Sequence, residues 1–265
     1  MIEYIKRVIE EHPKASDELC RLAWSGELGR GLPEITALDD VREIGDPGDS
    51  HKNNFYHSLQ VLDNISPDQG PLLRWSALLH DVGKPGTRQY SPGTGWTFHG
   101  HPELGASMVP GILTRFGYTD RRFIGSVERL VELHMRPSLI TGEPGGPSET
   151  AARHLIRDAG PLLGSLLTLA EADTTGRSAD LKRARIQRLA RVIEEVRAKD
   201  AWNSLNPVLN GTWLLEHYEF PDPSQIGTIK DALKRAIMDQ GVPNTPEALL
   251  PLVTGLATEL GLREL

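Results

Sequence analysis

Apolar residues recur at helical spacing along most of this chain, with polar residues at the positions between them. The pattern predicts two short helices near 3–12 and 16–28, and further helices after residue 53. The ranges expected for the later helices are 54–64, 71–83, 102–116, 121–134, 148–158, 162–173, 178–198, 224–241 and 245–260. We therefore expect an all-α fold.

The stretch 84–101 departs from this periodicity. It is rich in Gly, Pro and Thr, and the β-favouring runs TRQY and WTF flank SPGTG. This predicts one small β-hairpin near residues 86–99, projecting from a helical bundle. Trp96 and Phe98 in this hairpin could stack a nucleic-acid base, but packing against the helical body is the favoured interpretation.

Two regions are expected along the chain. Residues 1–200 should form one helical domain, with the helices of 1–45 packed on it. Residues 201–265 should form a Pro-punctuated helical tail region. No fixed-period repeat is present in the sequence.

The net charge of the chain is −7, so a broad nucleic-acid surface is not expected. The long basic helix predicted at 178–198 fits this view, because Leu181, Leu189 and Ile193 suggest a buried stripe. The basic residues of this helix, which include Lys182, Arg185 and Arg188, are then expected to lie mostly on its solvated face. Whether this face contacts RNA is left open.

Composition also bears on the cellular compartment. The single cysteine, Cys20, excludes an internal disulfide and suits a reducing compartment. The N-terminal residues lack the apolar run of a secretory signal, and no segment approaches a membrane span. We expect a cytoplasmic protein with no membrane partner. The pattern does not predict its oligomeric state.

The adjacent residues His80 and Asp81 follow the apolar run WSALL at the end of a predicted helix. An ionised carboxylate beside an imidazole is costly to bury unless a cation compensates it, and a divalent ion binds both groups. The pair could instead be a helix C-cap. Lys84 lies three residues beyond Asp81, close enough to neutralise a phosphate held by the metal.

Two further ligand candidates lie in similar contexts. His57 is on the polar side of the helix predicted at 54–64, and Asp173 ends an apolar helix. Together with His80 and Asp81 they would form a metal site on three helices, with open positions for water and substrate. Arg177 follows Asp173 by one turn and could face this site.

His101 and His134 lie at the ends of two other predicted helices. They could bind a second ion with Asp81 bridging, as in two-metal phosphoester hydrolysis. Alternatively, they contact phosphate or donate hydrogen bonds to the ligands. The remaining histidines are expected to be structural or solvated; these are His12, His51, His99, His154 and His217.

The order H…HD…D resembles the HD phosphohydrolase superfamily. The chain is more specifically similar to the HD portion and following region of bacterial tRNA nucleotidyltransferases, the CCA-adding family. The resemblance is carried by HKNNFYHSLQVLDNI, ALLHDVGKPGTR, WTFHGHPELGAS, VELHMRPSLI, LTLAEADTTGR and the tail PVLNGTWLLEHYEF. It spans about residues 30 to 250. The nucleotidyltransferase head, with its Gly-Ser loop and Asp-x-Asp pair, has no counterpart here, so CCA addition is not expected.

The resemblance implies a metal-dependent phosphohydrolase that acts on 2′,3′-cyclic nucleotides, 2′-nucleotides and other phosphoesters. It implies metal binding by His57, His80, Asp81 and Asp173. It also implies contacts to phosphate or a second metal by Lys84, Arg88, His101, His134 and Arg177.

We therefore predict a phosphodiesterase or phosphatase whose substrate is a phosphorylated nucleotide or RNA end. The cofactor is one or two divalent ions, with Mn, Ni, Co, Fe, Mg and Zn not distinguished. The residues expected to take part in catalysis are Asp81, Lys84, Arg88 and Arg177. The alternatives are a nucleotidase for free nucleotides or deoxynucleotides and a non-catalytic tRNA- or RNA-binding module.

Overall fold

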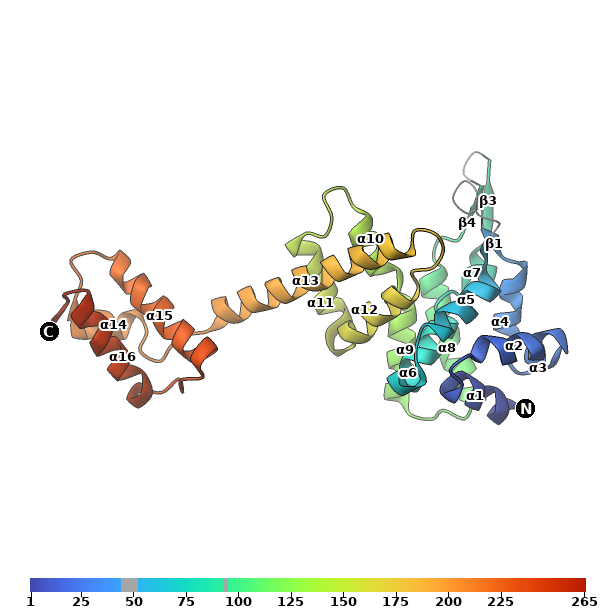
Figure 1. Cartoon of the computed structure of the whole chain (residues 1–265), viewed down its shortest axis with the longest axis horizontal. Coiled ribbons are helices and arrows are strands. Elements are labelled where there is room, and N and C mark those ends of the chain that lie inside the picture. Colours follow the sequence, from blue (N-terminus) through green and yellow to red (C-terminus); the bar gives the residue numbers. More distant parts are fainter. Residues whose placement is uncertain (44–51, 93–94) are drawn as a thin grey trace. The chain divides into compact units, whose positions relative to one another are not determined.

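The computed structural model describes residues 1–43, 52–92 and 95–265 (Figure 1). His51, which the sequence predicts to be solvated, and the hairpin positions 93–94 lie outside these ranges.

The chain divides into two compact units, Met1–Ile193 and Glu194–Leu265. Helix α13 (Ala179–Ser204) begins in the first unit and ends in the second. The domain boundary expected near residue 200 stays a prediction.

The first unit is helical. Its helices are α1 (Ile2–Glu11), α2 (Ala15–Trp24), α3 (Glu27–Gly31), α4 (Pro33–Thr36), α5 (Asn54–Asp63), α6 (Gly70–Leu79), α7 (Lys84–Thr87), α8 (His101–Arg115), α9 (Arg121–Leu133), α10 (Met135–Gly142), α11 (Glu149–Ala159), α12 (Leu163–Ala172) and the start of α13. Short 3₁₀ turns lie at η1 (Ala37–Asp40), η2 (Pro67–Gln69) and η3 (Gly160–Leu162). The all-α fold expected from the periodicity is confirmed.

Strands are short, and each forms a two-stranded antiparallel pair. The pairs are β1 (Arg42–Glu43) with β2 (Lys52–Asn53), β3 (Gln89–Ser91) with β4 (Gly95–Thr97), and β5 (Tyr218–Glu219) with β6 (Arg263–Glu264). The middle pair is the hairpin predicted near 86–99. The other two were not predicted, because two residues are too few to show an alternating pattern.

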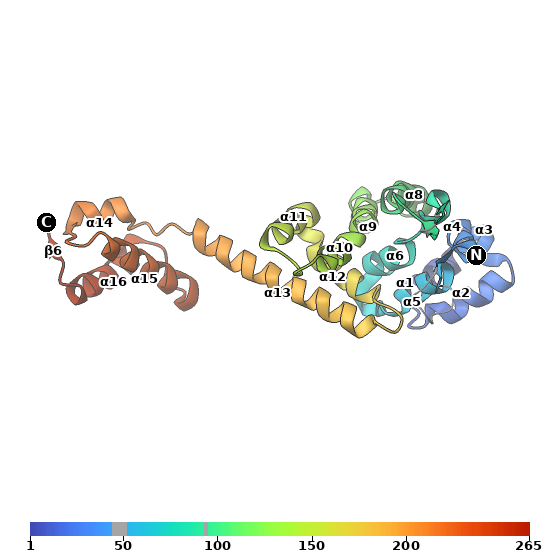
Figure 2. The ribbon, with the colours of Figure 1, turned by 90° about the horizontal axis from the view of Figure 1, so that it is seen from above.

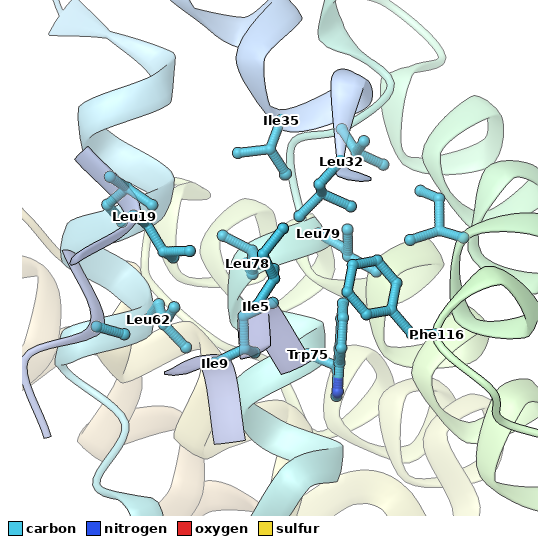
Figure 3. Packing of buried hydrophobic residues seen from close by; sticks show 14 of the residues in the cluster. Ile5, Ile9, Leu19, Leu32, Ile35, Leu62, Trp75, Leu78, Leu79 and Phe116 are labelled. Atoms are coloured by element: carbon cyan, nitrogen blue, oxygen red, sulfur yellow. The ribbon is translucent and has the colours of Figure 1, made fainter. Parts of the chain in front are cut away.

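Helix α6 is at the centre of the first unit and packs against α1, α5, α9 and α12. Figure 3 shows its Trp75 against Phe116, with Leu78 and Leu79 beside the N-terminal helices. Burying each such side chain contributes about 1.5–3 kcal/mol to folding. This core fixes the end of α6 relative to the helices around it.

Arg74 of α6 is fully buried and connects the N-terminal helices to this core. Its guanidinium donates hydrogen bonds to the backbone carbonyls of Ile9, Ile65 and His12, the last at 2.7 Å. A buried guanidinium is tolerated because its donors are satisfied in this way.

The predicted helix 71–83 ends at Leu79, and residues 80–83 form a turn. The cause is a close approach to α8. A Cβ on Gly83 would lie 2.2 Å from the carbonyl oxygen of His101 and 2.6 Å from the nitrogen of Gly105, so only glycine fits there. This contact places His80 and Asp81 beside the first turn of α8.

Three further differences from the sequence prediction have local causes. The helix expected at 16–28 ends at Trp24, because Gly26 adopts a left-handed conformation with φ 74°. Helix α10 was not predicted, since Pro137 lies in its sequence; proline is tolerated there because it lies in the first turn. The assignment of Leu181 to a buried stripe is wrong: it is 58% exposed, and Ile186 is buried beside Leu189.

The second unit is a small helical unit (Figure 2). It has its own apolar core. It contains α14 (Gly211–His217), α15 (Ser224–Gln240), α16 (Pro246–Glu259) and the β5–β6 pair. Its core includes Leu214, Ile229, Leu233, Leu249 and Val253.

Candidate metal centre

Helix ends bring a cluster of histidines and aspartates together inside the first unit. His57 comes from α5, and Asp173 comes from the residue that follows α12. The others come from the turn after α6, the first residue of α8 and the junction of α9 with α10; they are His80, Asp81, His101 and His134. All four histidines and Asp81 are buried.

The first group in this cluster joins His57, His80, Asp81 and Asp173. The Oδ1 atom of Asp173 lies 2.8 Å from Nε2 of His57 and 3.6 Å from Nε2 of His80. Oδ2 of Asp81 lies 3.1 Å from Nε2 of His80 and 3.8 Å from that of His57. Nitrogen and oxygen donors therefore converge on one point.

The second group uses the other oxygen of Asp81. Oδ1 lies 3.4 Å from Nε2 of His101 and 3.7 Å from Nε2 of His134. Two donor groups, His57–His80–Asp81 and Asp81–His101–His134, thus share one carboxylate. This arrangement suits a carboxylate that bridges two ions.

The tautomers of three histidines are set by backbone carbonyls. Nδ1 of His80 donates to Ala77 at 2.7 Å, and Nδ1 of His101 donates to Phe98 at 2.8 Å. Nδ1 of His134 donates to Val131 at 2.7 Å. In a neutral ring, Nε2 then carries the lone pair that binds a metal.

The close pairs of Nε2 atoms fit a bound cation. They lie 3.3 Å apart in His57 and His80, and 3.4 Å apart in His101 and His134. Two nitrogens bound to one ion at about 2.1 Å lie at most about 4.2 Å apart, so both pairs can share an ion.

Burial and charge act on the titration of the cluster. Burial lowers the pKa of His134 to about 4, helped by the charge of His80. For His80, burial opposes ionisation, but the charges of Asp81 and Asp173 raise its pKa. Burial also opposes ionisation of the two carboxyls, but their pKa values are lowered by His80, and that of Asp81 also by Lys84. Both carboxylates are therefore ionised at neutral pH.

Lys84 is buried and lies inside the cluster. Its Nζ is 2.9 Å from Oδ2 of Asp81 and donates to Oδ1 of Asn54 at 3.0 Å. Its amine also lies 5.6 Å from the centre of the Phe98 ring. The ammonium group of Lys84, which the sequence predicts to neutralise a phosphate, therefore lies against the carboxylate of Asp81 and neutralises it.

The other two predicted cations lie differently. Arg88 donates to the carbonyl of Asp40 at 2.9 Å, and its guanidinium lies 3.9 Å from the centre of the Trp96 ring. Arg177 is exposed. Their contacts with a substrate stay predictions.

The two aromatic side chains of the hairpin, Trp96 and Phe98, differ in their exposure to solvent. Phe98 is half-buried, as expected for packing on the body. For Trp96 that expectation is wrong, because its side chain is exposed.

Two supporting residues escaped the sequence prediction. Buried Asn54 orients Lys84, and its Nδ2 donates to the carbonyl of Val41 at 2.9 Å. The hydroxyl of Thr175 lies 3.2 Å from Nδ1 of His57. Thr175 lies two residues beyond Asp173, which is the only signal in the sequence that points to it.

The site and the helical fold agree with comparisons against known proteins. The model of the HD domain family matches residues 54–193, which is more than half of the chain. The chain belongs to the HD family, a superfamily of metal-dependent phosphohydrolases whose members bind divalent ions.

Similar curated proteins include tRNA nucleotidyltransferases. The chain is 30% identical to the A-adding tRNA nucleotidyltransferase of Deinococcus radiodurans over 89% of its own length and 57% of that protein. It is 30% identical to the CC-adding tRNA nucleotidyltransferase of Thermus thermophilus, over 49% of this chain and 34% of that one. It is 31% identical to the multifunctional CCA protein of Pseudomonas fluorescens, over 43% and 27%.

These matches confirm the resemblance to the HD portion of such enzymes. The chain spans well under two thirds of the length of each of these relatives. Within the described ranges, none of the helices is both long and apolar enough to cross a bilayer.

Proposed function

We propose that this protein hydrolyses phosphoester bonds of nucleotides or RNA ends, with 2′,3′-cyclic phosphates as the first candidate substrates. The observation that supports this most strongly is the division of the two Asp81 oxygens between two histidine pairs. The names of the relatives, which are A-adding and CC-adding tRNA nucleotidyltransferases, favour an RNA end or its nucleotide as substrate.

In the proposed site, His57, His80, Asp81 and Asp173 would hold one divalent ion. Asp81, His101 and His134 would hold a second. A bound ion of this kind would supply Lewis acidity to a phosphoryl oxygen and lower the pKa of water at the site.

The side chains of this chain have separate tasks. In the reaction, a water oxygen bonds to phosphorus, one ester P–O bond breaks, and the leaving oxygen takes up a proton. Lys84 keeps Asp81 ionised and adds positive charge beside the position of the phosphate, where negative charge grows in the transition state. Arg88 and Arg177 are proposed to bind outer phosphate oxygens.

Histidine-to-alanine variants test this function. His80→Ala combined with Asp81→Ala should lose bound metal and turnover of 2′,3′-cyclic nucleotides, whereas His154→Ala, an exposed histidine elsewhere in the unit, should keep both. The protein would be screened with Mn, Ni, Co, Fe, Mg and Zn against cyclic, 2′-, 3′- and 5′-phosphorylated nucleotides. Full turnover by the double variant would refute the proposal.

The same screen separates the alternatives. A nucleotidase would prefer free 5′-nucleotides or deoxynucleotides and gain nothing from a longer chain. A non-catalytic module would bind RNA without turnover of any substrate, and the triple variant of Lys182, Arg185 and Arg188 to Ala would abolish that binding.

A further inference from the structure

An aromatic pair is exposed on the hairpin that follows the HD turn. Tyr90 on β3 is paired with Trp96 on β4, and the centres of their rings lie 5.1 Å apart at 63°. Tyr90 is 61% exposed and Trp96 38%. Cross-strand aromatic pairs stabilise hairpins, but that role does not require large apolar rings to remain in water.

The hairpin connects this pair to the metal cluster. Strand β4 ends at Thr97, and Phe98 follows it directly, two residues after Trp96. The carbonyl of Phe98 accepts the hydrogen bond from His101, and the amine of Lys84 lies over its ring. The Cα atoms of Trp96 and Phe98 are at most about 7 Å apart. The exposed pair therefore belongs to the same short segment that contacts His101 and Lys84 at the cluster.

Charge along this segment favours an anionic ligand. The chain has net charge −7, yet no Asp or Glu occurs between Asp81 and Glu103. The guanidinium of Arg88 lies 3.9 Å from the centre of the Trp96 ring, so it covers one face of this ring with a cation. A phosphate approaching along the hairpin meets no carboxylate from this segment.

We propose that Tyr90 and Trp96 form a stacking platform for a nucleobase of the substrate while its phosphate lies at the metal cluster. The inference rests on the proposed function and narrows its substrate class to phosphoesters that carry a base. Stacking on aromatic side chains tolerates every base, because each has a π face. The platform therefore selects for the presence of a base and not for its identity.

The test compares substrates with and without a base. Wild type and Tyr90→Ala/Trp96→Ala would be assayed on adenosine 2′,3′-cyclic phosphate, on its abasic ribose analogue, and on an RNA tetranucleotide with a 2′,3′-cyclic end. We expect wild type to prefer the base-bearing substrates, mainly through KM, and the double variant to lose about tenfold of that preference. Tyr90→Phe/Trp96→Phe should keep it. The matched control is Trp24→Ala, because Trp24 is 78% exposed on α2 and should not contribute.

The outcomes separate this inference from the proposed function. If the double variant slows equally on all substrates, the pair only supports the hairpin and the inference is wrong. If the double variant loses activity only on the tetranucleotide, the platform binds a base upstream of the cyclic end. If it loses activity on the tetranucleotide and on adenosine 2′,3′-cyclic phosphate, the platform binds the terminal base. If wild type turns over no substrate, anisotropy with a labelled tetranucleotide still tests stacking: weaker binding by the double variant supports the platform although hydrolysis has failed, and equal binding overturns it.

Discussion

The carboxylate of Asp173 lies 2.8 Å from Nε2 of His57, although the two residues are far apart in the sequence. The same oxygen lies 3.6 Å from Nε2 of His80. Asp173, which follows α12, thus adds a carboxylate oxygen to the donor group of His57 and His80.

Removing the charge of Asp173 should weaken metal binding strongly. Changes to residues that only orient a ligand cost 10–100-fold in affinity, so we expect Asp173→Asn to lose more than about 100-fold. Titration calorimetry with Mn²⁺ measures this loss. Asp180→Asn, at an exposed carboxylate on α13, is the control and should bind normally. Equal affinity in the two variants would remove Asp173 from the site.

The hydroxyl of Thr175 should contribute through His57. Thr175→Val removes the group 3.2 Å from Nδ1 of His57 and leaves that ring less well oriented. We expect metal affinity to fall by about tenfold with little change in stability. Thr168→Val is the control, because the Thr168 hydroxyl donates to the carbonyl of Gly164 within α12, away from the cluster. A similar affinity in both variants would contradict the role given to Thr175.

Gly83 should be intolerant of any side chain. A Cβ there would meet the backbone of His101 and Gly105, which can move only by displacing α8. We expect Gly83→Ala to lower the free energy of unfolding by about 2–3 kcal/mol, measured by urea denaturation. Gly111 lies in α8 with open space around it, so Gly111→Ala should instead stabilise the protein by about 0.5–1 kcal/mol. Unchanged stability of Gly83→Ala would show that the contact is loose.

The ion pair between Glu34 and Arg115 should make stability depend on pH. Burial alone would raise the pKa of Glu34, but the bidentate hydrogen bonds from Arg115, at 2.9 and 2.6 Å, lower it below its ordinary value of 4.5. A lowered pKa in the folded state stabilises the protein above the unfolded value, and this stabilisation is lost as the pH falls through the folded value.

Glu34→Gln should therefore cost about 1 kcal/mol at pH 7, and less as the pH falls below about 4.5. Urea denaturation of both proteins at pH 7 and pH 3.5 measures the difference. A cost that does not change with pH would mean that charge is not its source.

Much of the helical fold follows from local patterns in the sequence. The spacing of apolar residues predicted α5, α8, α9, α12 and α15 to within a few residues, because a helix that buries one face needs that spacing. This spacing gave the wrong helix end or burial where contacts with another helix decide it. The end of α6 depends on how closely Gly83 approaches α8, and the exposure of Leu181 depends on which turn of α13 meets the core.

The sequence by itself determined which residue types are available for metal chemistry. His57, His80, Asp81 and Asp173 stand out because polar side chains in apolar helices are costly unless something compensates them. Tertiary structure alone decided that Asp81 divides its oxygens between two histidine pairs, that Lys84 neutralises it, and that Trp96 is left 38% exposed. The division of the Asp81 oxygens joins segments far apart along the chain, and its distances depend on how the helices pack, which local spacing does not encode.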